Sequence, residues 1–289
     1  MSSYFERRWV SHDGLNLFAR DYAGASGVAR LPVICLHGLT RNSKDFEELA
    51  PRLARSGRRI LVPDIRGRGL SDWDPRPSQY APKTYVRDTL GLMDALGISR
   101  AVFLGTSMGG IITMAVAAMR SRAVAAAILN DVGPAIAPEG LARILSYVGK
   151  PVEIRDWNDA AEYVRRTNAV AFPHYGDEDW RGFAQRTFRQ GSDGPVLHYD
   201  PAITVPLQTP PPRMAGPIAG LLFRRLARRR PTLLVRGETS DIVNAEIAGR
   251  MQRAAPRLQR IDVPGIGHAP MLTEPEAIGA IEDFLAGVP

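Results

Sequence analysis

The segment Ala101-Val-Phe-Leu-Gly-Thr-Ser-Met-Gly-Gly110 decides the fold. Its first four residues are apolar and predict a buried strand, and the small, apolar residues of 108–119 predict a helix. Between them, Gly105-Thr-Ser-Met-Gly109 fits the pattern G-x-S-x-G. In a strand–turn–helix context, this pattern is typical of a sharp turn that exposes a nucleophilic serine. Because Gly105 and Gly109 leave room around that turn, Ser107 is the candidate nucleophile.

Strand-like and helix-like segments alternate on both sides of this turn. Two N-terminal segments flank a turn and predict a hairpin, and short apolar runs predict further strands. Helical spacing predicts helices between them. Alternation of this kind predicts an α/β fold with a mostly parallel central sheet covered by helices on both faces. The expected strands are 5–10, 15–22, 32–36, 60–63, 101–104 and 125–129, and the expected helices are 45–55, 83–96 and 108–119.

The alternation stops at Gly133 and resumes near Thr232. The intervening chain has three helix-like segments and then a proline-rich stretch, 195–217. A helical block inserted into an alternating domain is typical of a lid. We therefore expect a core formed by 1–132 and 231–289 and a helical lid formed by 133–230. The helices expected in the lid are 138–148, 157–167 and 177–190; the core should continue with strands 232–235 and 258–263 and helices 245–254 and 276–285.

Composition limits the classes of protein that the chain can belong to. The single cysteine, Cys35, excludes an intramolecular disulfide framework and a cysteine-based zinc finger. One cysteine fits a reducing compartment, and neither a signal peptide nor an apolar run long enough to span a membrane is evident. We therefore expect a cytoplasmic protein without stable membrane insertion, and its oligomeric state stays open.

The net charge of +7 raises the alternative of a nucleic-acid or membrane-surface binder. Five of the 37 lysines and arginines lie in the short run Arg224–Arg230, beside the predicted lid. The excess charge is therefore a local feature. It favours a small-molecule substrate over a nucleic-acid partner, and the role of the basic run stays open.

A nucleophilic serine needs a general base, and the base needs an orienting acid. His268 is the best of five histidines, because it lies in a glycine-rich loop after the last expected strand, where sites of α/β sheets assemble. Two aspartates follow expected strands. We favour Asp241 as the acid and keep Asp131 as the alternative, with a role as a residue that lines the substrate site. The chain order Ser…Asp…His is satisfied by both and cannot choose between them.

The anion formed by attack on a carbonyl needs backbone N–H donors. The turn aims the Met108 amide toward that position. The second donor should come from the loop after the first central parallel strand, and Leu39 is the candidate. The neighbouring His37, Gly38 and Thr40 are expected to line the substrate site.

Five motifs in this order resemble the α/β-hydrolase superfamily: His37-Gly38, Asp64–Ser71, Gly105–Gly110, Arg236–Asp241 and Gly267–Pro270. The resemblance implies a Ser107–His268–Asp241 triad, Leu39 and Met108 as oxyanion donors, a supporting role for Asp64–Ser71, and no cofactor or metal. Relatives with an aspartate at the position of Ser107 are disfavoured. The expected function is cleavage of a small carboxylic ester or lactone through an acyl-enzyme. The alternatives are a C–C bond hydrolase acting on a vinylogous diketone and a hydrolase-fold receptor with little turnover.

Overall fold

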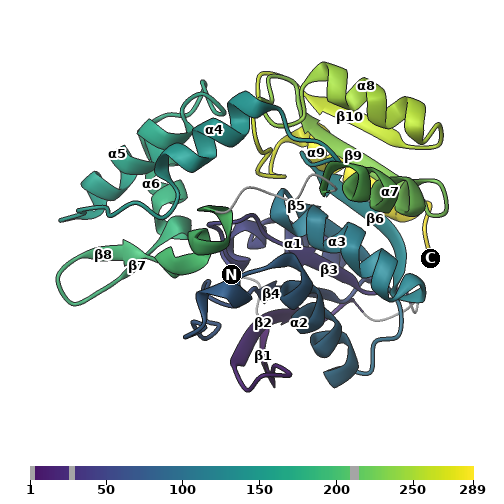
Figure 1. The fold of residues 1–289 in the computed structure, drawn as a ribbon, viewed down its shortest axis with the longest axis horizontal. Helices are drawn as coiled ribbons and strands as arrows, with labels where there is room; N and C mark the ends of the chain where they lie inside the picture. Colours follow the sequence, from purple (N-terminus) through teal and green to yellow (C-terminus); the bar gives the residue numbers. More distant parts are fainter. Residues whose placement is uncertain (1–3, 26–29, 209–214) are drawn as a thin grey trace.

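The computed structural model describes residues 4–25, 30–208 and 215–289, and their central element is an eight-stranded sheet (Figure 1). The strand order is β1-β2-β4-β3-β5-β6-β9-β10. Pairing is antiparallel from β1 through β2 to β4 and parallel from β4 to β10. The predicted mostly parallel sheet is therefore confirmed. The strands are β1 (Phe5–Val10), β2 (Asn16–Tyr22), β3 (Val33–Leu36), β4 (Ile60–Asp64), β5 (Ala101–Thr106), β6 (Val124–Asn130), β9 (Thr232–Gly237) and β10 (Gln259–Val263).

Helices cover both faces of the sheet. In β3, Ile34 and Leu36 belong to one buried cluster and Val33 and Cys35 to another, as the two-residue period of a strand requires. The first cluster includes α2 (Pro82–Ala95), α3 (Met108–Met119), α7 (Ala215–Ala227) and α8 (Ala245–Ala254), and the second includes α1 (Leu49–Arg55) and α9 (Pro275–Ala286). A strand buried on both faces needs a continuous apolar run, which is what β3 has.

Between β6 and α7 the chain forms a separate group of elements, here called the insert (residues 134–208), which lies to one side in Figure 1. Its helices confirm the predicted helical character of this region, but the segment predicted as one helix over 177–190 ends in a strand that begins a short hairpin. The elements are α4 (Pro138–Tyr147), α5 (Trp157–Asn168), α6 (Asp177–Thr187), β7 (Phe188–Gln190), β8 (Pro195–Leu197) and the 3₁₀ helix η4 (Pro201–Gln208).

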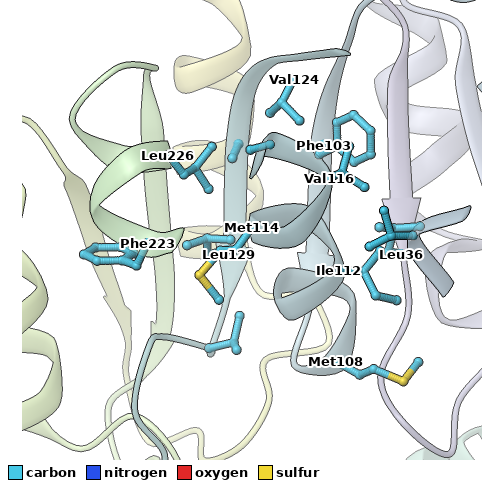
Figure 2. Packing of buried hydrophobic residues seen from close by; sticks show 14 of the residues in the cluster. Leu36, Phe103, Met108, Ile112, Met114, Val116, Val124, Leu129, Phe223 and Leu226 are labelled. Carbon is cyan, nitrogen blue, oxygen red and sulfur yellow. The ribbon is translucent and has the colours of Figure 1, made fainter. Parts of the chain in front are cut away.

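The predicted lid range of 133–230 extends too far, because α7 packs on the core. Phe223 and Leu226 are fully buried and lie beside Met114 of α3 and Leu129 of β6 (Figure 2). The basic side chains Arg224 and Arg225 are exposed. The helix therefore buries an apolar stripe and leaves its charges in solvent, which is the usual pattern of a surface helix.

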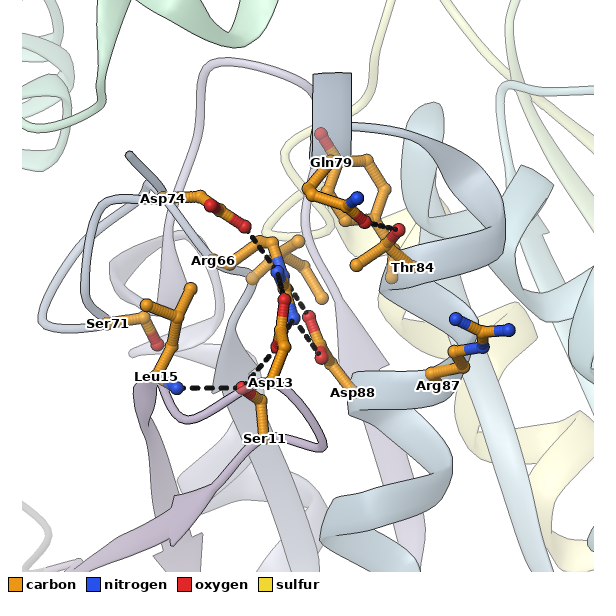
Figure 3. A network of polar contacts seen from close by, with 12 residues as sticks. Ser11, Asp13, Leu15, Arg66, Ser71, Asp74, Gln79, Thr84, Arg87 and Asp88 are labelled. Carbon is orange, nitrogen blue, oxygen red and sulfur yellow. Dashed lines mark hydrogen bonds and ion pairs between the residues drawn. The ribbon is translucent and has the colours of Figure 1, made fainter. Parts of the chain in front are cut away.

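The segment Asp64–Ser71 supports the core, as the family resemblance implies. Arg66 is fully buried and binds the carboxylates of Asp13, Asp74 and Asp88 (Figure 3). These contacts tie the β1–β2 turn and α2 to the loop after β4. Because removing one partner of such a buried pair leaves an uncompensated charge, the network fixes the loop strongly. Across the described residues, every helix is too short or too polar to span a bilayer.

Candidate active site

Ser107 lies at the turn between β5 and α3, in a backbone conformation that few side chains adopt (φ 51°, ψ −113°). A Cβ at Gly105 would lie 2.4 Å from the carbonyl carbon of Gly109, and one at Gly109 would lie 2.1 Å from the carbonyl oxygen of Leu36. Only glycine fits at either position. The turn therefore stores strain and presents the serine at the strand end, which is a recurring property of functional sites.

Ser107, His268 and Asp131 form a continuous hydrogen-bonded chain. His268 Nε2 lies 3.0 Å from Ser107 Oγ, and His268 Nδ1 lies 2.7 Å from Asp131 Oδ2. An ionised carboxylate only accepts hydrogen bonds, so Nδ1 carries the proton and Nε2 is free to accept the serine hydroxyl proton. The carboxylate of Asp131 is completely buried and also accepts from Ser240 Oγ and the Gly237 amide.

The structure brings Asp131, and not the favoured Asp241, to the imidazole of His268. Asp241 binds Arg143 of α4 through two hydrogen bonds of 2.6 and 2.8 Å and, among the described residues, forms no hydrogen bond with His268. Burial raises the pKa of Asp241, but the hydrogen bonds from Arg143 and the nearby positive charge, chiefly that of Arg143, together outweigh burial and hold the pKa below its usual value. In the turn after β9, Ser240 rather than Asp241 faces Asp131: its hydroxyl donates to Asp131 and accepts from the amides of Ile242 and Val243.

The loop that carries His268 is fixed from two sides. The Gly267 amide donates to the Ala171 carbonyl at 2.7 Å, and Asn130 Nδ2 donates to the Pro270 carbonyl at 2.8 Å. Asn130 immediately precedes Asp131 at the end of β6, so one strand end orients both the loop and the imidazole of the histidine. This arrangement holds the base in place before any substrate binds.

Two backbone amides are available beside Ser107. A Cβ at Gly38 would lie 3.9 Å from the Ser107 Cβ, so the loop after β3 approaches the serine closely. Within the described residues, neither the Leu39 nor the Met108 amide donates to an acceptor. Met108 is the first residue of α3, where amides lack partners and the helix dipole favours negative charge. The predicted oxyanion donors are thus free to bind a ligand.

A cavity of about 90 Å³ lies over these groups. Gly38, Leu39 and Thr40 line it, together with Ser107 and His268. The loop residues Arg41 and Asp45 and most of the lining residues from the insert were not predicted from the sequence. No local motif marks those insert residues, which are Ile144, Tyr147, Val148, Asn168, Phe172 and Phe183.

His37 and Asp131 were expected to line the substrate site, and both lie behind it instead. His37 is completely buried: its Nδ1–H donates to the Gly38 carbonyl at 2.8 Å, and Nε2 accepts from the Ile65 amide at 3.0 Å. The ring is therefore neutral, and burial lowers its pKa to about 4. Its role is to fix the loop that carries Leu39.

This neutral histidine predicts a loss of stability in acid. The unfolded chain binds a proton at His37 near pH 6.5, whereas the folded chain binds it only near pH 4. The stabilisation that the neutral His37 ring provides is complete above pH 6.5 and is lost as the pH falls from 6.5 toward 4. Between pH 7 and 5 this loss should remove about 2 kcal/mol from the free energy of unfolding. The free energy of unfolding, measured by urea titration, should therefore fall more steeply with decreasing pH in the wild type than in His37→Gln. Equal slopes in the two proteins would contradict the assignment of a neutral, buried His37.

Within the described ranges, one group of three candidate ligands exists, His12, Asp13 and Asp88, and none of them lines the cavity. Both carboxylates already bind Arg66. Occupied in this way, they are poorly suited to hold a cation.

The chain belongs to the α/β hydrolase fold family, whose sequence pattern matches residues 32–275. Among its relatives, the 3-hydroxybutyrate-oligomer hydrolase of Cupriavidus necator is 33% identical over 283 residues, 96% of each chain. The 2-(acetamidomethylene)succinate hydrolase of Mesorhizobium japonicum is 29% identical and covers 88% of this chain and 87% of its own. A solved α/β hydrolase from Novosphingobium aromaticivorans has 43% identity, a TM-score of 0.90 and 99% coverage of both chains.

Proposed function

We propose that the protein is a serine hydrolase that cleaves a small carboxylic ester or lactone through an acyl-enzyme intermediate. The observation that carries the proposal is the continuous hydrogen-bonded chain from Ser107 through His268 to Asp131, next to two unpaired backbone amides. Nucleophile, base, orienter and oxyanion donors are the complete set that acyl transfer requires.

In the proposed reaction, Ser107 Oγ attacks the ester carbonyl while His268 Nε2 takes its proton. The Leu39 and Met108 amides donate to the oxyanion of the tetrahedral intermediate. His268 then returns the proton to the leaving alcohol, and a water molecule, activated by the same nitrogen, cleaves the acyl-enzyme. The buried Asp131 holds the imidazole in the required tautomer and stabilises the imidazolium.

The cavity and the relatives favour a short acyl unit. Its volume of about 90 Å³ is small beside the roughly 300–1,000 Å³ of pockets that hold drug-sized ligands. The relative at 33% identity is named for 3-hydroxybutyrate oligomers, which are linear esters with four-carbon units. Short 3-hydroxyacyl oligoesters are therefore the first substrates to test.

We expect turnover of 3-hydroxybutyrate dimers and trimers, short p-nitrophenyl esters or simple lactones by the wild type, with loss in Ser107→Ala. The panel should also include a vinylogous 1,5-diketone, measured by loss of its absorbance. If the wild type cleaves the diketone and none of the esters or lactones, the proposed ester hydrolysis is wrong and C–C bond hydrolysis takes its place. Tight binding without turnover on any of these compounds would indicate a receptor and contradict the proposal.

A further inference from the structure

Arg68 is a completely buried arginine that has no carboxylate within 4 Å anywhere in the described chain. It lies in the loop after β4, and its guanidinium is surrounded by neutral groups. Nη1 donates to the Arg66 carbonyl at 2.8 Å and to the Tyr85 hydroxyl at 3.0 Å, and the ring faces of Tyr80 and Tyr85 lie 5.6 and 5.0 Å away. Burying an unpaired charge is costly, so its persistence calls for a functional explanation.

The remaining donors of Arg68 reach the two residues that carry the candidate oxyanion amides. Nε donates to the Leu39 carbonyl at 2.9 Å, and Nη2 lies 3.7 Å from Met108 Sδ. One buried side chain therefore contacts both halves of the oxyanion hole from behind.

The direction of the Leu39 amide depends on two adjacent peptide planes. The Leu39 N–H shares its plane with the Gly38 carbonyl, which accepts from His37 at 2.8 Å. The Leu39 carbonyl belongs to the next plane and accepts from Arg68. With both planes held, the φ and ψ angles of Leu39 are fixed, and with them the direction of its N–H, before any substrate binds.

The loop that carries Arg68 is itself anchored. The backbone of Arg68 pairs with Tyr199 in an antiparallel bridge, and the Gly69 amide donates to the His198 carbonyl at 2.9 Å. The Ile65 amide of the same loop donates to His37 Nε2. The loop after β4 thus reaches the oxyanion loop twice, through Ile65 and through Arg68.

We propose that Arg68 is a positioning residue of the oxyanion hole: it fixes the Leu39 peptide and Met108, and it places a buried positive charge behind the site where the oxyanion forms. The inference rests on the proposed function, because it concerns the transition state of that reaction. A fixed charge in a water-excluded wall favours an anionic transition state over a neutral substrate without cost in reorganisation.

The test compares Arg68→Met and Arg68→Lys with Arg58→Met. Arg58 is a matched control, because it is also completely buried and also binds backbone carbonyls, those of Leu285, Val288, Leu31 and Pro289, but it does not touch the cavity. Arg68→Met should lower kcat on an ester turned over by the wild type about 10- to 100-fold at nearly constant KM, less than the roughly 100–1000-fold for loss of a whole donor. Arg68→Lys should recover part of kcat.

A boronic acid that forms a tetrahedral adduct at Ser107 provides a second readout, since its affinity follows transition-state stabilisation. The affinity for the boronic acid should fall in parallel with kcat/KM in Arg68→Met and stay unchanged in Arg58→Met. If Arg68→Met and Arg58→Met behave alike after correction for the folded fraction, the inference is overturned. If Arg68→Met does not fold, Arg68→Lys is the deciding variant. A kcat and a boronate affinity of Arg68→Lys equal to those of the wild type would overturn the inference. A wild type that neither cleaves esters nor forms the adduct overturns the proposed function, and this inference with it.

Discussion

Ser107→Ala is expected to reduce kcat by about a million-fold, to the residual rate that the oxyanion donors and binding alone supply. The reason is geometric: the hydroxyl 3.0 Å from His268 Nε2 is the group positioned to become the nucleophile, and alanine removes it without filling new space. Hydrolysis of a p-nitrophenyl ester under single-turnover conditions measures the loss.

The same variant should lose covalent labelling by a fluorophosphonate, detected as a mass shift on the peptide that contains Ser107. Circular dichroism and the unfolding midpoint should remain close to those of the wild type, since Ser107 Oγ makes no other described hydrogen bond. Full labelling of Ser107→Ala, or activity that survives purification away from host esterases, would refute its role as nucleophile.

Asp131→Asn should lower kcat by about ten-thousand-fold, whereas Asp241→Asn should leave kcat within about threefold. An asparagine amide that donates to His268 Nδ1 forces the other tautomer, in which Nε2 carries the proton and cannot accept one from Ser107. Within the described part of the chain, the Asp241 carboxylate binds Arg143 alone, in a partly exposed ion pair of the kind that contributes little to stability.

The two variants control for each other, because each converts one carboxylate near the site to its nearly isosteric amide. Initial rates across pH 5–9 should separate them, and each protein should first pass a thermal unfolding check. The assignment fails if Asp241→Asn loses activity while Asp131→Asn keeps it.

The strand–turn–helix around Ser107 was predictable because every signal there is local. An apolar run, two obligatory glycines and a small-residue helix are sufficient to define it. The apolar runs of β3 to β6 likewise predicted the parallel sheet. Their burial on both faces follows from composition alone.

The choice between Asp131 and Asp241 depended on a long-range feature that the sequence does not display. Both follow strands that end at the same edge of the sheet, so spacing and order allowed either. The outcome is set by the turn after β9, in which Ser240 caps two amides and approaches Asp131. The insert was harder still, since its cavity-lining residues come from three separate segments that meet only in the folded chain.

Two neighbouring residues of the turn after β9 have different partners. Asp241 binds Arg143 of the insert, whereas Ser240 binds Asp131. A Cβ at Gly140 of α4 would lie 2.2 Å from the Asp241 carbonyl oxygen, and the Ala137 amide donates to Ile242 at 3.0 Å. The turn after β9 therefore anchors α4, the insert helix that supplies Ile144 and Tyr147 to the cavity. Because Ser240 of the same turn binds Asp131, substitutions confined to α4 are the ones that can change the shape of the cavity without disturbing the proposed proton-transfer chain.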